Sequence, residues 1–166
     1  MRFFNWRKNK KVPCTPSETA PPALTASSAV CDAMEEISKL ITGDDLVAVE
    51  ASRCALDIAG YYSAHEEWYE ERGLGPDDPQ LCWFGLVEIL ERRHYACERD
   101  WKEEKEDFLF FFGRLKGIQR FALPIDPDWF SAEGDIAEWC AVLRDKWAEK
   151  RCFAAAFAID SDSYVL

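Results

Sequence analysis

The sequence lacks the short motifs that assign a reaction to a protein. It contains no G-x-G-x-x-G, no Walker sequence and no G-x-S-x-G, so no dinucleotide site, P-loop or serine-hydrolase elbow is indicated. Histidine is scarce, with only His65 and His94. His65-Glu66-Glu67 is not a zinc-protease motif, because Tyr69 stands where the second histidine would be. We therefore predict no cofactor and no bound metal.

A long apolar run is also absent. No stretch of about 18 apolar residues occurs, so the sequence predicts no membrane-spanning helix. The seven cysteines are odd in number and none are paired at C-x-x-C spacing, which favours reduced, buried thiols over a disulfide framework or a zinc site. Prolines interrupt residues 12–29, so the basic start is not followed by the apolar segment of a signal peptide. These absences together predict a cytoplasmic protein.

Acidic residues outnumber basic ones. The chain has 31 acidic and 20 basic residues, a net charge of −11. Residues 1–11 carry five of the basic residues and no acid, which leaves 15 basic residues against the 31 acids in the remainder, a balance of −16. Such a body repels nucleic-acid phosphates and attracts a protein partner with a basic surface. The alternative is that the charge serves solubility alone.

The N-terminal segment differs from the rest in composition. Residues 1–27 combine the basic cluster with many Pro, Ser and Thr, and we expect them to form a flexible arm. Phe3, Phe4 and Trp6 stand beside the basic residues, which is compatible with a tether of residues 1–11 to a membrane surface or an acidic partner. A free tail is favoured, because one short cluster gives only marginal membrane binding. Residues 28–166 are predicted to form a single acidic globular domain.

Apolar residues at helical spacing predict about five helices in the body. Asp44 or Asp45 is a suitable N-cap for the second helix, and Gly43 a suitable end for the first. Asp78 and Pro79 suit the start of the third. The helices are expected at residues 29–41, at 46–62 with an extension towards 68, at 79–93, at 108–115 and from 132 or 135 to 150. Gly117 is expected to end the fourth, and residues 118–130, with two prolines, are predicted to be a connection.

Two short strands are predicted at the C-terminus, besides one at residues 94–98. Residues 153–159 alternate larger apolar residues with alanine, so that Phe153, Phe157 and Ile159 would share one buried face of a strand. The alternative is an extension of the preceding helix. Asp160-Ser161-Asp162-Ser163 is predicted to be the turn of a hairpin with residues 164–166. The predicted fold is therefore α+β, with about five helices packed on a small, mostly antiparallel sheet that includes a C-terminal β-hairpin.

Three segments of the second half resemble a known family. They are Asp100-Trp101-Lys102-Glu103-Glu104, the helix residues 82–87 (CWFGLV) and the closing residues 158–165 (AIDSDSYV). Over about residues 79–166 the chain resembles a family of small acidic bacterial domains of unknown function. The resemblance implies a bacterial cytosolic α+β domain and supports the strand at 153–159, but it implies no catalytic residues. Lys150-Arg151 stands where a glycine-like break is expected before that strand.

The favoured function is a non-catalytic protein-binding module, such as an immunity protein or a regulator of the bacterial cytosol. Asp100, Trp101, Glu103 and Glu104 are its candidate partner-binding residues, because a tryptophan beside acids can anchor an interface with a basic partner. The alternative position for Trp101 is the hydrophobic core.

Four residues are weaker candidates for chemistry. A small enzyme would use a thiol or carboxylates around His94, Cys97 and Asp160, with His94 and Cys97 as a thiol and base pair. Asp160 and Asp162 also resemble the start of a calcium loop. The glycine and the bidentate glutamate of such a loop are missing, so a turn is the better interpretation.

Overall fold

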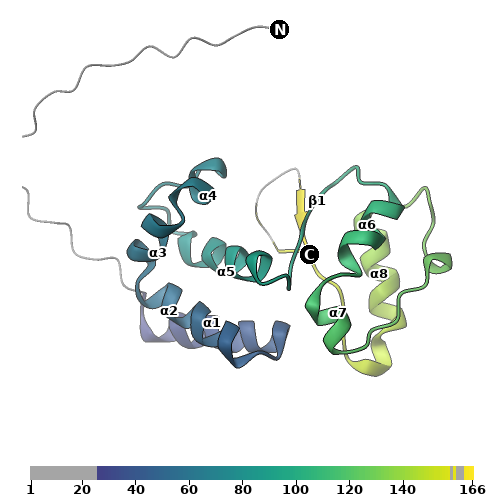
Figure 1. Cartoon of the computed structure of the whole chain (residues 1–166), viewed down its shortest axis with the longest axis horizontal. Coiled ribbons are helices and arrows are strands. Elements are labelled where there is room, and N and C mark those ends of the chain that lie inside the picture. Colours follow the sequence, from purple (N-terminus) through teal and green to yellow (C-terminus); the bar gives the residue numbers. More distant parts are fainter. Residues whose placement is uncertain (1–25, 158, 160–162) are drawn as a thin grey trace, which may run out of the picture.

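The computed structural model describes residues 26–157, 159 and 163–166. The predicted N-terminal arm and its membrane tether lie almost wholly outside the described residues, as do Asp160 and Asp162 of the predicted turn. The described residues form eight α-helices, two short 3-10 helices and a two-stranded antiparallel sheet (Figure 1). The helices are α1 Ser28–Thr42, α2 Asp45–Leu56, α3 Ile58–Ala64, α4 Glu66–Glu71, α5 Leu81–Arg92, α6 Lys105–Phe112, α7 Lys116–Arg120 and α8 Ile136–Lys146; η1 is Pro127–Trp129, η2 is Ala148–Lys150, and the strands are β1 Glu98–Asp100 and β2 Ser163–Val165.

The turn between α1 and α2 is formed by the residues that the sequence indicates. Gly43 has φ 60°, and its amide donates to the Lys39 carbonyl oxygen at 2.8 Å. A glycine adopts this left-handed conformation without steric cost. Asp44 then caps α2, because its Oδ1 accepts a hydrogen bond from the Leu46 amide at 3.0 Å.

The predicted second helix is divided into three, so the number of helices is higher than five. Asp57 has φ −130° and ψ 63°, which ends α2, and its carboxylate accepts from the Gly60 amide at 3.1 Å at the start of α3. An aspartate side chain competes in this way for amides that a continuous helix would use. His65, with φ −127°, makes the second break, between α3 and α4.

Helix α5 lies at the centre of the first hydrophobic cluster. Residues 84–90 are all buried, and Gly85 lets the neighbouring elements approach closely. A Cβ added at Gly85 would lie 2.5 Å from Cys54 Sγ of α2 and 2.9 Å from the Tyr69 hydroxyl of α4. The helix begins later than predicted, at Leu81, because Asp78 closes a turn by accepting from the Gln80 amide at 2.8 Å.

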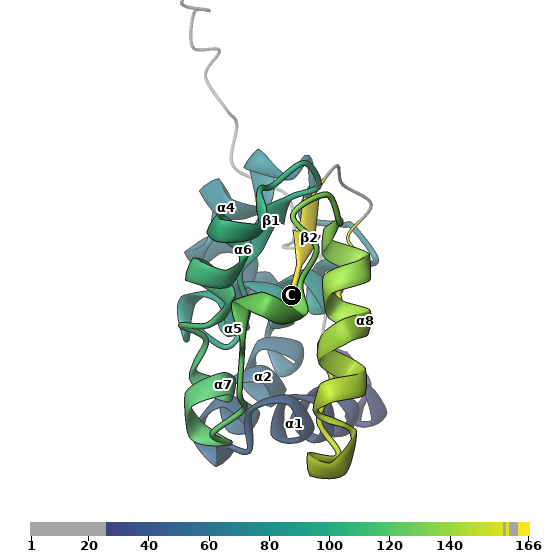
Figure 2. The ribbon, with the colours of Figure 1, turned by 90° about the vertical axis from the view of Figure 1, so that its right-hand side faces the viewer.

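The buried residues form two hydrophobic clusters. The first combines side chains of α1 to α5 with Ile159 and Val165. The second combines α6 and α8 with Leu115, Phe130, Trp147 and Leu166. Figure 1 shows α1 to α5 on one side, α6 to α8 on the other, and the C-terminus between them, and Figure 2 shows the C-terminus beside α8 in the second view.

The sheet joins the C-terminal strand to the segment that follows α5. Glu98 pairs with Val165 and Asp100 with Ser163, antiparallel. Cys97 and Leu166 exchange backbone hydrogen bonds of 2.9 and 3.0 Å beside this ladder. The C-terminal strand is thus confirmed, while the strand predicted at 94–98 begins only at Glu98.

Residues 153–159 were predicted to pair with the C-terminal strand in a hairpin, and this prediction is wrong, because β2 pairs with β1. Residues 152–156 form neither a strand nor a helix, and only Phe157 makes an isolated bridge to Val165. Phe153, predicted to be buried, is 69% exposed, whereas Ile159 is buried as predicted. The chain turns away after η2, where Arg151 adopts φ 56° in place of the expected glycine.

The remaining helices differ from the predictions mainly at their ends. α6 begins at Lys105, earlier than the predicted residue 108, and Gly117 lies inside the short α7 instead of ending a helix. η1 falls in the predicted connection. α8 begins where Asp135 predicts it, since the Asp135 carboxylate accepts from the Glu138 amide at 2.8 Å. The fold is mostly helical with a small antiparallel sheet.

Replacing Val165 by alanine should destabilise the protein. Val165 is fully buried, so V165A removes two buried methyl groups and leaves a cavity, and we expect a loss of about 2 kcal/mol in the free energy of unfolding. Urea unfolding followed by circular dichroism measures this. F153A is the control, with an expected loss within about 0.5 kcal/mol, and equal losses in the two variants would contradict the observed position of the C-terminal strand.

Candidate functional site

Three large aromatic side chains are exposed along the segment that runs from the end of β1 through α6. Trp101 is 52% exposed, Phe110 50% and Phe111 43%, so the alternative position of Trp101 in the core is not the one observed. These three residues are called the aromatic surface below. Large apolar side chains are costly to leave in water, and a patch of them marks a surface that binds another molecule.

Arg99 connects the two elements that carry the aromatic surface. From β1, its guanidinium donates to Glu103 Oε1 at 2.8 Å and lies 3.9 Å above the Phe111 ring of α6. Arg114 lies 3.5 Å above the Phe110 ring, and the Phe110 and Phe111 rings meet edge to face at 5.1 Å. These contacts restrain the Phe110 and Phe111 rings, which lowers the entropy that these two rings lose when they bind a partner.

The four predicted partner-binding residues take different positions at this surface. Asp100, Trp101 and Glu104 are exposed, while Asp100 Oδ1 also accepts from the Lys102 amide at 2.8 Å and shapes the turn. Glu103 is nearly buried, and its Oε2 has no hydrogen-bond partner among the described residues. Burial raises the pKa of Glu103, against the opposing effect of Arg99. Glu103 therefore supports the surface from below.

A second arrangement, which no sequence motif indicates, surrounds the buried carboxylate of Glu88 in α5. Glu88 Oε2 accepts a hydrogen bond from the Tyr61 hydroxyl, and Oε1 accepts from Arg92 Nε at 2.9 Å. His65 Nδ1 lies 3.4 Å from Oε1, and the His65 ring stacks on Tyr61 with centroids 4.4 Å apart. Burial and the bond to Glu88 raise the pKa of Tyr61, which keeps the phenol protonated as a donor.

The same network continues to α2 through two arginines. Arg92 Nη2 donates to Glu50 Oε1 at 2.6 Å, and Arg93 Nε donates to Glu50 Oε2 at 2.9 Å. Burial opposes ionisation of Glu50, but these two bonds outweigh it, so the pKa of Glu50 is lowered. Each carboxylate in this network is paired with a cation, which is the condition for burying it at acceptable cost.

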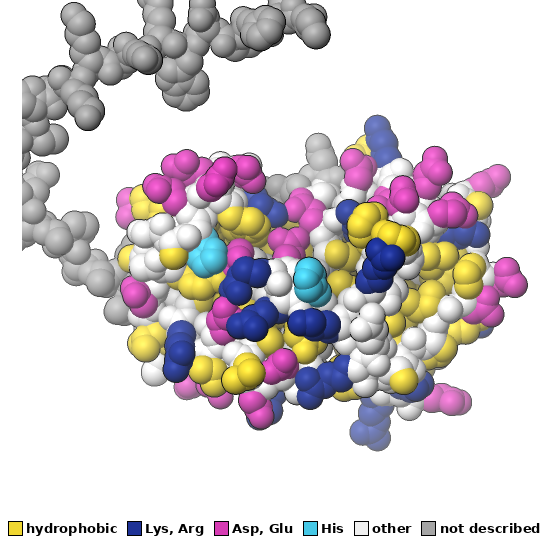
Figure 3. Space-filling model, in the orientation of Figure 1, with side chains coloured by type: hydrophobic (Ala, Val, Ile, Leu, Met, Phe, Trp, Pro, Cys, Tyr) yellow, Lys and Arg dark blue, Asp and Glu magenta, His cyan; other side chains and the backbone are white. Residues whose placement is uncertain are grey.

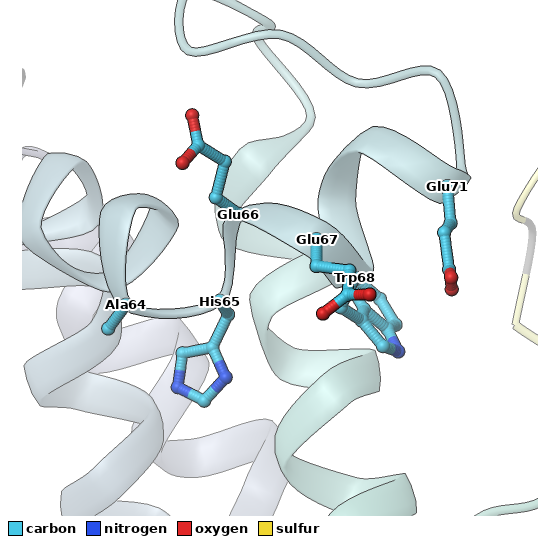
Figure 4. Close-up of a pocket in the computed structure, with 6 residues that line it drawn as sticks. All are labelled: Ala64, His65, Glu66, Glu67, Trp68 and Glu71. Atoms are coloured by element: carbon cyan, nitrogen blue, oxygen red, sulfur yellow. The ribbon is translucent and has the colours of Figure 1, made fainter.

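A shallow hollow of about 350 Å³ opens at the junction of α3 and α4, beside this network. Figure 4 shows His65, Glu67 and Trp68 directed to one side of the junction, with Glu66 directed away. The hollow is acidic and open, and Arg72 already covers Trp68 at 3.8 Å from the ring. His65 joins the hollow to Glu88, but the hollow contains neither His94 nor Cys97.

Of the four weaker candidates for chemistry, the structure describes His94 and Cys97. His94 is exposed at the end of α5, with φ 62°. Burial raises the pKa of the Cys97 thiol to about 11, whereas a nucleophilic cysteine needs a lowered pKa. Asp160 and Asp162 lie outside the described residues. In the part of the chain that the structure describes, no three His, Cys, Asp or Glu side chains are grouped so that they could hold a metal ion.

Residues 33–166 match the family model of a domain of unknown function, DUF6630. The chain belongs to this family. The match includes the region at 79–166 where the sequence resembles such a family, and it extends through α2 to α4 into α1. Neither a curated protein nor a solved structure matches the chain. Among the described helices, none has the length and apolar character needed to cross a membrane.

Phe110, Phe111 and Glu88 were not predicted as site residues, although the sequence contains signals for them. Residues 108–112 (FLFFF) are consecutive apolar residues in a helix, and a single buried face cannot contain all of them. Phe110 and Phe111 are the two that remain exposed. Glu88 stands within the apolar run 81–90 of α5, which indicates a buried charge with a partner. The partners Tyr61 and Arg92 cannot be named from the run itself.

Replacing Tyr61 by phenylalanine tests the Glu88 network. Y61F removes the hydroxyl donor and leaves Glu88 Oε2 under-satisfied, so we expect a loss of about 1–3 kcal/mol in the free energy of unfolding. Urea denaturation measures it. Y62F is the control, because Tyr62 is buried on the same helix but has no hydroxyl bond to Glu88. A loss no greater than that of Y62F would show that the hydroxyl bond contributes nothing.

Alkylation of Cys97 tests the thiol alternative. With a pKa of about 11, Cys97 is almost wholly protonated at pH 8, so iodoacetamide should label it about 100-fold more slowly in the folded than in the unfolded protein. The rate should rise with pH up to about 11. Peptide mass spectrometry measures each site, and Cys140 of α8, with its pKa also raised by burial to about 11, is the internal control. Faster labelling of Cys97 than of Cys140 at pH 7 would favour an activated thiol.

Proposed function

We propose that this DUF6630 domain is a non-catalytic protein-binding module of a bacterial cytosol, which binds its partner through the aromatic surface. The single observation that supports this is the exposure of Trp101, Phe110 and Phe111 between the end of β1 and the end of α6. Tryptophan and other large rings contribute most of the binding energy in protein interfaces. A role as an immunity-like protein or regulator fits such a module.

The acids beside the aromatic surface support a partner with a basic surface. Asp100 is exposed at the end of β1 and Glu104 at the N-cap of α6, and Glu106 and Asp107 follow in the first turn of α6. A body of balance −16 adds a long-range attraction for a basic partner. Aromatic rings would then provide affinity, while the carboxylates would accelerate association and select the sign of the partner's charge.

The states of the other candidate residues, Glu88, Glu50 and Cys97, also favour binding over catalysis. The charges of Glu88 and Glu50 are paired with arginines, and the thiol of Cys97 is kept protonated by burial. An enzyme requires a titratable group poised near the working pH within reach of a substrate. The aromatic surface needs no such group, since burial of the rings on contact is sufficient.

Trp101 should be necessary for partner binding. The full chain, immobilised, retains partners from an extract of the source cell; a basic protein retained by it is identified by mass spectrometry, purified and titrated by calorimetry. W101A, and separately F110A/F111A, should weaken the dissociation constant at least about 10-fold, because each removes rings from the centre of the contact. D100N/E104Q should reduce the affinity less and weaken its dependence on salt.

F153A is the matched control for these variants. Phe153 is 69% exposed but lies outside the aromatic surface, so its replacement should change the dissociation constant less than about 2-fold. Circular dichroism checks that every variant is folded. The proposal fails if F153A weakens binding as much as W101A, or if the aromatic variants bind every retained protein as the wild type does.

A further inference from the structure

One surface of the domain is basic, although the domain as a whole is acidic. Figure 3 shows Lys and Arg side chains gathered in the middle of one face, with a histidine among them, while acids gather towards the upper edge. The residues of this surface come from the end of α5 and from α7. The basic face, as it is called below, consists of Arg92, Arg93, His94, Lys116 and Arg120.

The backbone brings these residues together. The Lys116 amide donates to the His94 carbonyl oxygen at 2.8 Å, which fixes the start of α7 against the end of α5. Lys116 and Arg120 are four residues apart on α7, so their side chains lie on one face of that helix. Lys116 Nζ also lies 5.8 Å from the centre of the Tyr95 ring. The two exposed cations therefore extend the row that Arg93 and His94 begin.

The far end of the basic face rests on the turn between α1 and α2. A Cβ at Gly43 would lie 3.6 Å from Arg120 Nε, which places the Arg120 side chain against that turn. Asp44 is the nearby acid, and its oxygens already accept from the Leu46 amide and from the Tyr95 hydroxyl at 3.1 Å. Arg120 contributes to lowering the pKa of Asp44, after the larger effect of the Leu46 amide.

The acids at the basic face leave two of its cations without an ion pair. Glu50 and Glu88 both pair with Arg92, and Glu50 also pairs with Arg93, so these two arginines are matched by two carboxylates. Within the described residues, no carboxylate forms an ion pair with Lys116 or Arg120, and both side chains are exposed. Cations left unpaired on a body of balance −16 are a local exception that solubility does not require.

We propose that the basic face binds an acidic polypeptide segment of a protein partner. Its cations form a row across two elements, which matches the repeated carboxylates of an extended chain by charge complementarity. A single small anion has less to gain, since it would contact only part of this row of cations. A nucleic-acid duplex would bring its many phosphates close to the acidic remainder. This surface is separate from Trp101, so the two proposals stand independently.

Fluorescence anisotropy tests the proposal with the full chain and a labelled 12-residue peptide rich in glutamate. Binding is expected at 50 mM salt and should weaken steeply as salt is raised. K116E/R120E should weaken the dissociation constant at least about 10-fold, because it reverses the two unpaired cations. K102E/R144E makes the same change in net charge at exposed positions elsewhere and should weaken it less than about 3-fold.

Four outcomes would overturn the proposal. They are absence of peptide binding at 50 mM salt, equal weakening by the two charge-reversal variants, complete competition by millimolar inorganic phosphate, and tighter binding of duplex DNA than of the peptide. Size-exclusion chromatography adds a further arm: self-association that K116E/R120E abolishes would identify the acidic body of a second copy as the occupant, and would likewise overturn a foreign acidic segment. Circular dichroism confirms that both variants are folded.

Discussion

The backbone pairing between Cys97 and Leu166 holds the two hydrophobic clusters together. Neighbouring side chains of a strand point to opposite sides, and here each side has its own core. Ala96 and Val165 belong to the first cluster, whereas Cys97 and Leu166 pack in the second. The hydrogen bonds of 2.9 and 3.0 Å between Cys97 and Leu166 therefore lie where the two cores meet. The short ladder is therefore anchored at this end, where its residues pack into both cores.

The same pairing positions the aromatic surface. β1 leaves the ladder at Asp100, so the chain reaches Trp101 at the edge of the molecule. Side-chain contacts on both faces of β1 then fix the direction of this strand. Arg72 of α4 donates to Glu98 at 2.7 Å, and Ser163 of β2 donates to the same carboxylate, while Arg99 reaches α6. Successive residues of β1, Glu98 and Arg99, thus connect to different helices, which restrains the strand before the turn to Trp101.

Signals within a few residues of one another could be read from the sequence, and pairings across the chain could not. Gly43, Asp44 and Asp135 act locally, through a left-handed turn or a side chain that accepts a nearby amide. Gly43 was predicted as a helix end, and Asp44 and Asp135 were each one of two predicted positions for a helix start. Phe153 was predicted to be buried because it alternates with alanine. Alternation states which residues share a face, but only a paired partner buries that face, and β2 pairs with β1, 65 residues earlier.

In the candidate site, too, local signals could be read from the sequence, whereas contacts between distant segments could not. Trp101 beside acids was a readable signal, and the structure places it on the surface, where the proposal needs it. The pair of Phe110 and Phe111 follows from a run of apolar residues too long for one buried face. The basic face was hidden, because its cations are dispersed over residues 92–120 of an acidic sequence. Contacts between different elements bring them together, above all the hydrogen bond from the Lys116 amide to the His94 carbonyl oxygen.

The chain from His94 to Trp101 connects the two proposed surfaces and sets the distance between them. His94 belongs to the basic face and Trp101 to the aromatic surface, and the residues between them are held by the ladder. Tyr95 and Ala96 are buried against the first cluster, so this connection cannot lengthen without exposing core residues. Two partners, or two parts of one partner, would therefore be held at a fixed separation. A flexible linker between the surfaces would instead lose most of that gain in effective concentration.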